Sequence, residues 1–119
     1  MYRYDDAITI LVNHFSEMKD IYELNMDDYE DLPYVFYESE FVKFIVNSAN
    51  ADNKKMLREV FDFVEDMLKN GDEKVVNLLE VAVVESIYFD NNILDKKAIE
   101  SYFGALTLKS YKDCFQQHA

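Results

Sequence analysis

The sequence predicts one all-α domain spanning residues 1–119, with five to seven antiparallel helices, and three observations support this prediction. A chain of 119 residues is long enough for one domain. Half of its residues are hydrophobic, which is typical of a protein with a packed core. It has only two glycines and one proline, far fewer turn-forming residues than a β-sandwich or barrel needs. Scarce helix breakers therefore favour long helices joined by short connections.

The first helical pattern covers residues 5–24, where apolar residues recur at the spacing of one helix face. Asp5 or Asp6 can cap its start, because an aspartate side chain accepts a hydrogen bond from the first free amides of a helix. The pattern is compatible with one long helix or with two helices broken near Ser16.

A loop is expected at about residues 26–32, where the apolar spacing fails. Pro33 follows, and proline suits the first turn of a new helix. We expect that helix to cover residues 33–49. Its stretch 41–46 is aromatic and β-branched and alone could form a strand. We interpret it as helical because the sequence offers no partner strand with an alternating pattern.

Residues 51–69 give the clearest helical pattern in the chain. Asp52 or Asn53 can cap this helix, and Gly71 can end it because glycine readily takes the left-handed backbone conformation.

The next helix is expected at about residues 72–89, with Asp72 as its cap. It is apolar almost all the way round, so we expect it to be buried at the centre of the domain. The other helices can surround it as a bundle or as a short helical-repeat-like stack, and the sequence does not decide between the two.

Two shorter helices complete the prediction. Asp95 can cap one that ends near Tyr102 and is terminated by Gly104. Thr107 is the expected cap of the last helix, which reaches about Gln117.

The charge of the chain restricts its partners. Twenty-four acidic residues and twelve basic residues give a net charge of −12. Nucleic acid and anionic membrane surfaces repel such a protein, so a basic protein is the expected partner. The N-terminus lacks a signal-peptide pattern, and no apolar run is long enough to cross a membrane. We therefore expect a cytoplasmic protein.

No residue pattern typical of catalysis or metal binding is present. His14 and His118 have no ligand-like spacing to each other or to acids. Cys114 is the only cysteine, and no histidine forms a recognisable motif with it. The sequence thus predicts a protein that is not an enzyme and has no metal or other cofactor.

The acidic residues are concentrated in one segment. Residues 17–40 contain nine acids and one base, a net charge of −8, together with four of the nine tyrosines. One interpretation is a solvated acidic face whose tyrosines help to cover the core. The other is a docking surface, because charge steers a partner and tyrosine is frequent at interface hot spots. The candidate partner-binding residues are Asp27, Asp28, Tyr29, Glu30, Asp31, Tyr34, Tyr37, Glu38 and Glu40.

Glu80 and Glu85 are secondary partner-binding candidates, because acids on an otherwise apolar helix require a reason. A structural role for both, as a cap or in a salt bridge, is the alternative.

The second half of the chain resembles a known family. Residues 60–75, the run Val83-Val84-Glu85-Ser86-Ile87 and the element Phe103-Gly104-Ala105 followed by Tyr111 are similar to small bacterial immunity proteins of polymorphic-toxin and contact-dependent growth-inhibition systems. The family usually has proline where this chain has Ala105, and commonly tryptophan where it has Tyr111.

The resemblance implies an all-helical antitoxin that neutralises a cognate secreted toxin, often a basic nuclease, by tight 1:1 binding. Blocking of the active cleft and blocking of an adjacent exosite both remain open. The rival hypotheses are an acidic protein-binding module or nucleic-acid mimic with a non-toxin partner, and an enzyme or metal carrier that uses dispersed carboxylates.

Overall fold

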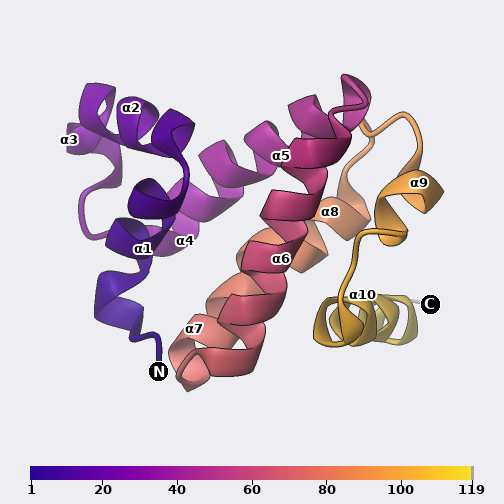
Figure 1. Ribbon diagram of the computed structural model, residues 1–119. Helices are drawn as coiled ribbons and strands as arrows, with labels where there is room; N and C mark the ends of the chain where they lie inside the picture. Colours follow the sequence, from indigo (N-terminus) through magenta and orange to yellow (C-terminus); the bar gives the residue numbers. More distant parts are fainter. Residues whose placement is uncertain (119) are drawn as a thin grey trace.

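The computed structural model describes residues 1–118, and this part of the chain contains eight continuous helices joined by short connections. Figure 1 shows their arrangement. The prediction of a single all-α domain is confirmed. Six of the helices are simple: α1 (Ala7–His14), α2 (Ser16–Leu24), α3 (Met26–Tyr29), α6 (Lys54–Asn70), α9 (Lys96–Glu100) and α10 (Ala105–Gln117). Between α3 and α6 runs a composite helix of three continuous segments, α4 (Pro33–Phe36), η2 (Tyr37–Phe41) and α5 (Val42–Asn50). A second composite helix follows α6 and consists of α7 (Glu73–Leu78), η3 (Leu79–Glu85) and α8 (Ser86–Phe89).

The composite helix α7–η3–α8 is the central one, as predicted. Its middle segment η3 contacts η2, α6 and α10, so other helices cover it on several sides. Seven of its apolar side chains are buried: Val75, Leu78, Leu79, Ala82, Val83, Val84 and Ile87. They join one continuous hydrophobic core with residues from the rest of the chain.

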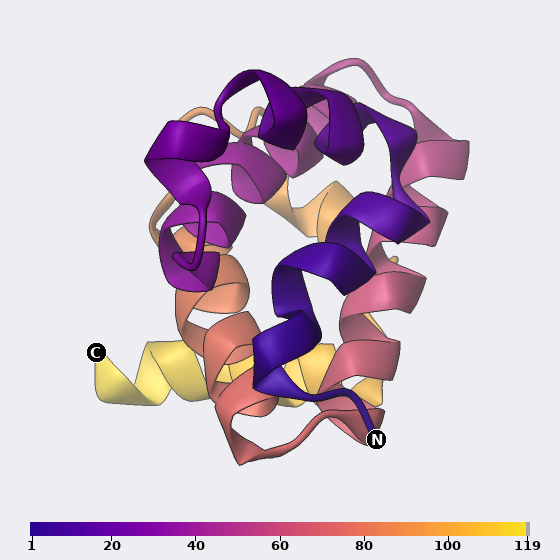
Figure 2. The ribbon, with the colours of Figure 1, turned by 90° about the vertical axis from the view of Figure 1, so that its left-hand side faces the viewer.

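The remaining helices cover this centre from two ends. Helices α1, α2 and α3 lie at one end of the molecule, and α9 and α10 lie at the other (Figure 1). Helix α10 runs across α6 rather than antiparallel to it (Figure 2). The arrangement is therefore an irregular bundle and not a repeat-like stack of parallel helix pairs. The prediction of five to seven helices missed α3, which is a single turn inside the expected loop.

The N-terminal helical pattern is two helices, broken at Phe15. This residue has an extended backbone, with φ −123° and ψ 114°. The break allows the buried Phe15 ring to pack between Phe41 and Phe63, with centroid distances of 5.8 and 5.4 Å. A 3₁₀ turn (η1, Tyr4–Asp6) precedes α1, and the side chain of Asp6 forms no capping hydrogen bond.

Three predicted caps are confirmed. Asn53 accepts a hydrogen bond from the Met56 amide at 3.2 Å. Asp72 accepts one from Val75 at 2.8 Å, and Asp95 accepts one from the Ala98 amide at 3.1 Å. Each side chain satisfies one of the amide groups that a helix start leaves free.

The expected left-handed conformation of Gly71 is wrong, because its φ is −85° and its ψ is 157°. Glycine is needed here because a side chain would not fit between the neighbouring atoms. A Cβ atom would lie 2.6 Å from the Met67 carbonyl oxygen. The N-terminal segment also passes beside Gly71: the Tyr2 amide donates to the Asn70 carbonyl, and the Asp72 amide donates to the Tyr2 carbonyl, both at 2.8 Å.

Thr107 does not cap the last helix, since α10 already begins at Ala105. The cap comes instead from Glu65 on α6. Its carboxylate accepts hydrogen bonds from the Leu106 amide at 3.0 Å and from the amide and hydroxyl groups of Thr107 at 2.9 Å each. Gly104, at the N-cap position, has no side chain that could do this. The contact fastens α10 to α6.

Replacing Glu65 with alanine is expected to lower the free energy of unfolding by about 1–2 kcal/mol, because three donors at the start of α10 lose their acceptor. Urea unfolding of Glu65→Ala measures the loss. Glu59→Ala, on the exposed side of the same helix, is the matched control and should change the stability little. Equal effects of the two substitutions would contradict the capping role.

The stabilisation by Glu65 should depend on pH. Burial by itself would raise the pKa of this carboxyl, but the hydrogen bonds from Thr107 and Leu106 outweigh burial and hold the pKa below its ordinary value of 4.5. A carboxyl with a lowered folded-state pKa stabilises the fold above its unfolded-state pKa and loses this contribution as the pH falls through the folded value. The stability difference between wild type and Glu65→Ala should therefore shrink below about pH 4.5. A difference that stays constant down to pH 2 would contradict this.

Candidate functional site

Residues 24–35, the end of α2 through α3 to α4, form a surface that combines acidic and apolar side chains; we call it the α3 surface. Its acids Asp27, Asp28, Glu30 and Asp31 are all exposed. Four apolar side chains are exposed among them: Leu24 (84%), Met26 (42%), Leu32 (47%) and Val35 (44%). Because apolar groups surrounded by charge are typical of protein-binding surfaces, this combination supports the predicted docking role of the acidic segment.

The backbone of the α3 surface is held in a tight turn. The Glu30 amide donates to the Met26 carbonyl at 2.9 Å, and the Leu32 amide donates to the Tyr29 carbonyl at 3.0 Å. Asp31 has a φ of 60°, in the left-handed region that aspartate tolerates better than most residues. The turn therefore presents Glu30 and Asp31 on an ordered backbone.

Three tyrosines of the acidic segment 17–40, Tyr22, Tyr29 and Tyr34, are half-buried. The rings of Tyr22 and Tyr29 pack on Phe36, with centroid distances of 5.3 and 5.1 Å. Burial raises the pKa of Tyr29, and the neighbouring Glu40 carboxylate raises it further. The Tyr34 hydroxyl accepts a hydrogen bond from the Asn77 side chain at 2.5 Å. These half-buried rings support the α3 surface from below.

Tyr37 is wrongly assigned as a partner contact. Its side chain is completely buried, and its hydroxyl donates a 2.7 Å hydrogen bond to the Ala7 carbonyl. Burial raises its pKa well above the ordinary value of 10.0. The residue lies on the inner side of the composite helix with the buried Phe41, where it ties α4–η2 to α1.

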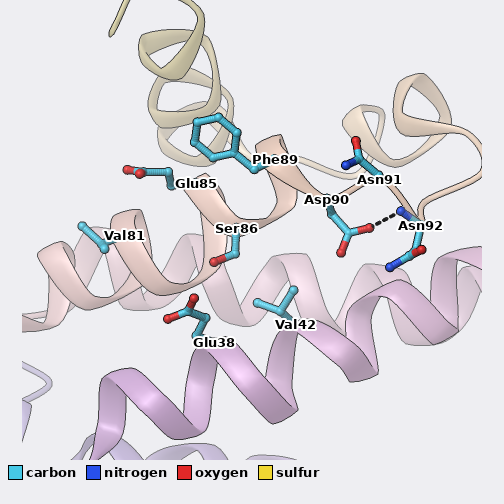
Figure 3. A pocket seen from close by; sticks show the side chains of 9 residues that line it. All are labelled: Glu38, Val42, Val81, Glu85, Ser86, Phe89, Asp90, Asn91 and Asn92. Carbon is cyan, nitrogen blue, oxygen red and sulfur yellow. Dashed lines mark hydrogen bonds between the residues drawn. The ribbon is translucent and has the colours of Figure 1, made fainter. Parts of the chain in front are cut away.

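Glu38 and Glu40 lie on different sides of the composite helix, because side chains two residues apart do not face each other. Glu40 lies beside Tyr29, under the α3 surface. Glu38 faces η3 across the gap between the two composite helices (Figure 3). The structure therefore does not gather all nine predicted residues into one surface.

A groove separates the two composite helices where Glu38 lies; we call it the inter-helix groove. It has a volume of about 660 Å³, with Glu38 and Val42 on one wall and Val81, Glu85 and Phe89 on the other. Glu38 and Ser86 point toward each other across it (Figure 3). At its end, the Asp90 carboxylate accepts hydrogen bonds from the amides of Asn92 at 2.7 Å and Ile93 at 3.1 Å. Among the described residues that line the groove there is no lysine or arginine.

Of the two secondary candidates, Glu85 lines this groove and Glu80 lies in a hollow that adjoins it. With Val81, Glu85 also lines this hollow, which has a volume of about 160 Å³ and includes Asp113. Sequence reasoning missed Phe89 and Asp90, at the end of the same helix as Glu85, and Asp113, which comes from the distant helix α10. The one sequence feature that pointed to this groove was the presence of acids on an otherwise apolar helix.

Cys114 and His14 each pack against other residues of the fold. Cys114 is buried with its thiol near the Ser110 carbonyl, and burial, followed by the charges of Glu85 and Asp113, raises its pKa. A raised thiol pKa disfavours the reactive thiolate. His14 is exposed and packs against Phe63 at 4.9 Å. Within residues 1–118, no cluster of three or more histidine, cysteine or acidic residues could hold a metal ion.

Comparison with protein families gives one result. A family model described as "Domain of unknown function (DUF7674)" matches residues 8–118, which is most of the chain.

The chain belongs to this family. The match of the DUF7674 model begins in α1 and ends just after α10, so it covers both the α3 surface and the inter-helix groove. No curated protein and no solved structure matches the chain. None of the helices in the described part is both long and apolar enough to cross a membrane.

Tyr37→Phe is expected to lower the free energy of unfolding by about 1 kcal/mol, because the ring stays buried while the hydrogen bond to Ala7 is lost. Tyr34→Phe is the matched control and should cost less, since the hydrogen bond of Tyr34 to Asn77 lies at the surface. Urea unfolding of both variants tests the structural role. A Tyr37→Phe protein as stable as wild type would contradict it.

Proposed function

We propose that this protein is an immunity protein that neutralises a cognate secreted toxin, a basic nuclease, by tight 1:1 binding. The observation that carries the proposal is the α3 surface, where four exposed acids surround four exposed apolar side chains. The resemblance of residues 60–75 and of the elements around Glu85 and Gly104 to immunity proteins supports the same function.

The two kinds of side chain serve different steps of such binding. Acids concentrated on one surface attract a basic partner and can raise its association rate toward about 10⁸ M⁻¹s⁻¹ at low salt. Exposed Leu24, Met26 and Leu32 give the partner apolar area to bury. Apolar contact at the centre of an interface slows dissociation, and an acidic rim determines which partner is accepted. An immunity protein needs both, because a single free toxin molecule can do lasting damage.

Calorimetry with the toxin domain encoded beside this protein tests the function. We expect a 1:1 complex of nanomolar or tighter affinity that weakens as the salt concentration rises, with loss of toxin activity at equimolar ratio. Salt should weaken the complex because it screens charges at an exposed interface. Failure to bind at either low or high salt would contradict the immunity function and would favour an acidic module with a different basic partner.

Charge reversal tests the α3 surface itself. The triple variant Asp27→Lys, Asp28→Lys, Glu30→Lys should slow association with the toxin by about ten- to a hundredfold, because these exposed acids steer the encounter. Asp31 is left unchanged because its φ of 60° is poorly tolerated by lysine.

The matched control carries the same charge change elsewhere: Asp6→Lys, Glu59→Lys, Asp62→Lys, all at exposed positions. Stopped-flow association rates at low salt compare the two triple variants. Equal rates would show that net charge alone matters and would contradict the assignment of the contact to the α3 surface.

A further inference from the structure

The inter-helix groove lies between two π-helical segments, η2 and η3. In η2 the Val42 amide donates to the Tyr37 carbonyl, five residues back, instead of four as in an α-helix. Such a segment contains one more residue per turn and changes the direction of the side chains that follow. Glu38 is in η2 and Glu85 is in η3, so both acids are carried by these segments. Short π-helical segments are frequent at functional sites.

The groove also exposes apolar surface, although the His118 ring packs edge-on against one side of Phe89, with a centroid distance of 4.7 Å. Val81 is 44% exposed and Phe89 is 51% exposed, although both belong to the most apolar helix of the protein. The Phe89 ring packs edge-on against Tyr88, with a centroid distance of 5.0 Å, so it has a fixed orientation. A fixed aromatic ring that is half exposed is well suited to anchor a binding partner.

The charge of the groove selects the occupant. Glu38 and Glu85 line the groove from different helices, with the Glu85 side chain turned away from Glu38 beside Val81 (Figure 3), and Asp90 lies at the end of the groove. A second copy of this chain would bring another net charge of −12 toward these acids, and nucleic acid and anionic lipid would be repelled in the same way. A basic polypeptide segment is complementary to the groove. Arginine fits best, because its planar guanidinium can form two parallel hydrogen bonds to one carboxylate.

We propose that the inter-helix groove docks a basic segment of a partner protein, with arginine side chains paired to Glu38 and to Glu85 and an apolar side chain packed on Val81 and Phe89. The identity of this partner as the toxin rests on the proposed function, whereas the chemistry of the segment follows from the groove alone. The groove and the α3 surface together then form a two-part interface.

The test uses two probes. The first is a blocked helical peptide with arginine and leucine at four-residue spacing, titrated into isotope-labelled protein and followed by NMR. We expect the shift changes to concentrate at residues 38–46 and 81–92, and the affinity to fall as salt rises. The same peptide with glutamate in place of arginine should not bind. Shift changes confined to the α3 surface, or to neither region, would overturn the proposal.

The second probe is the neighbouring toxin domain, with variants of the groove. Glu38→Gln combined with Glu85→Gln, and separately Phe89→Ala, should each weaken toxin binding at least tenfold. The control pair Glu59→Gln, Asp62→Asn removes the same charge from the outer side of α6 and should change the affinity less than twofold. Circular dichroism confirms that each variant remains folded.

The two probes separate failure of the groove from failure of the immunity function. Toxin binding that is unaffected by the groove variants, with no peptide response in the groove, would overturn the docking proposal and leave the function standing. A peptide response in the groove without any toxin binding would support the docking of a basic segment and contradict the immunity function.

Discussion

Burial of the composite helix α7–η3–α8 is the constraint on which the rest of the structure depends. Its apolar residues point in nearly every direction, so helices from both halves of the chain must cover it. The core is built around it by η2, α6 and α10, and α6 holds α10 in place through Glu65. One strip of the central helix, with Glu80, Val81 and Phe89, stays exposed. The inter-helix groove lies along that strip, so the feature that organises the fold also creates the groove that we propose as a binding surface.

Charge and packing are divided between the inside and the outside of the same segment. In residues 17–40 the aromatic rings turn inward onto Phe36 and the acids remain outside. Like charges concentrated in one segment repel one another and oppose folding. A solvated face without a partner does not need its charges to be concentrated in this way. The exposed Leu24 and Leu32 also favour a binding surface. Covering apolar side chains with a partner removes them from water, which is favourable. Both features support the hypothesis that this end of the molecule binds a protein.

Most of the fold could be predicted from the sequence, because it follows from local patterns. Helical spacing and side-chain caps predicted α6 and the central helix, with Asn53 and Asp72 in the predicted roles. The failures concern contacts between distant residues. The cap of α10 comes from Glu65, 41 residues before Leu106 and therefore invisible to a local reading. The prediction of the candidate site also failed where contacts between distant residues decide the outcome. A linear acidic segment seemed to be one surface, but helix geometry buries Tyr37 and turns Glu38 toward Ser86, which is far away in sequence (Figure 3).

Hydrogen–deuterium exchange on the complex with the proposed toxin partner tests most directly the claim that acidic, partly apolar surfaces bind a basic partner. The account predicts slower exchange at residues 24–35 and 81–92 when the toxin is present, with the outer side of α6 around Glu59 unchanged. Slower exchange confined to other regions, or no change under conditions where the toxin is active and in excess, would contradict it.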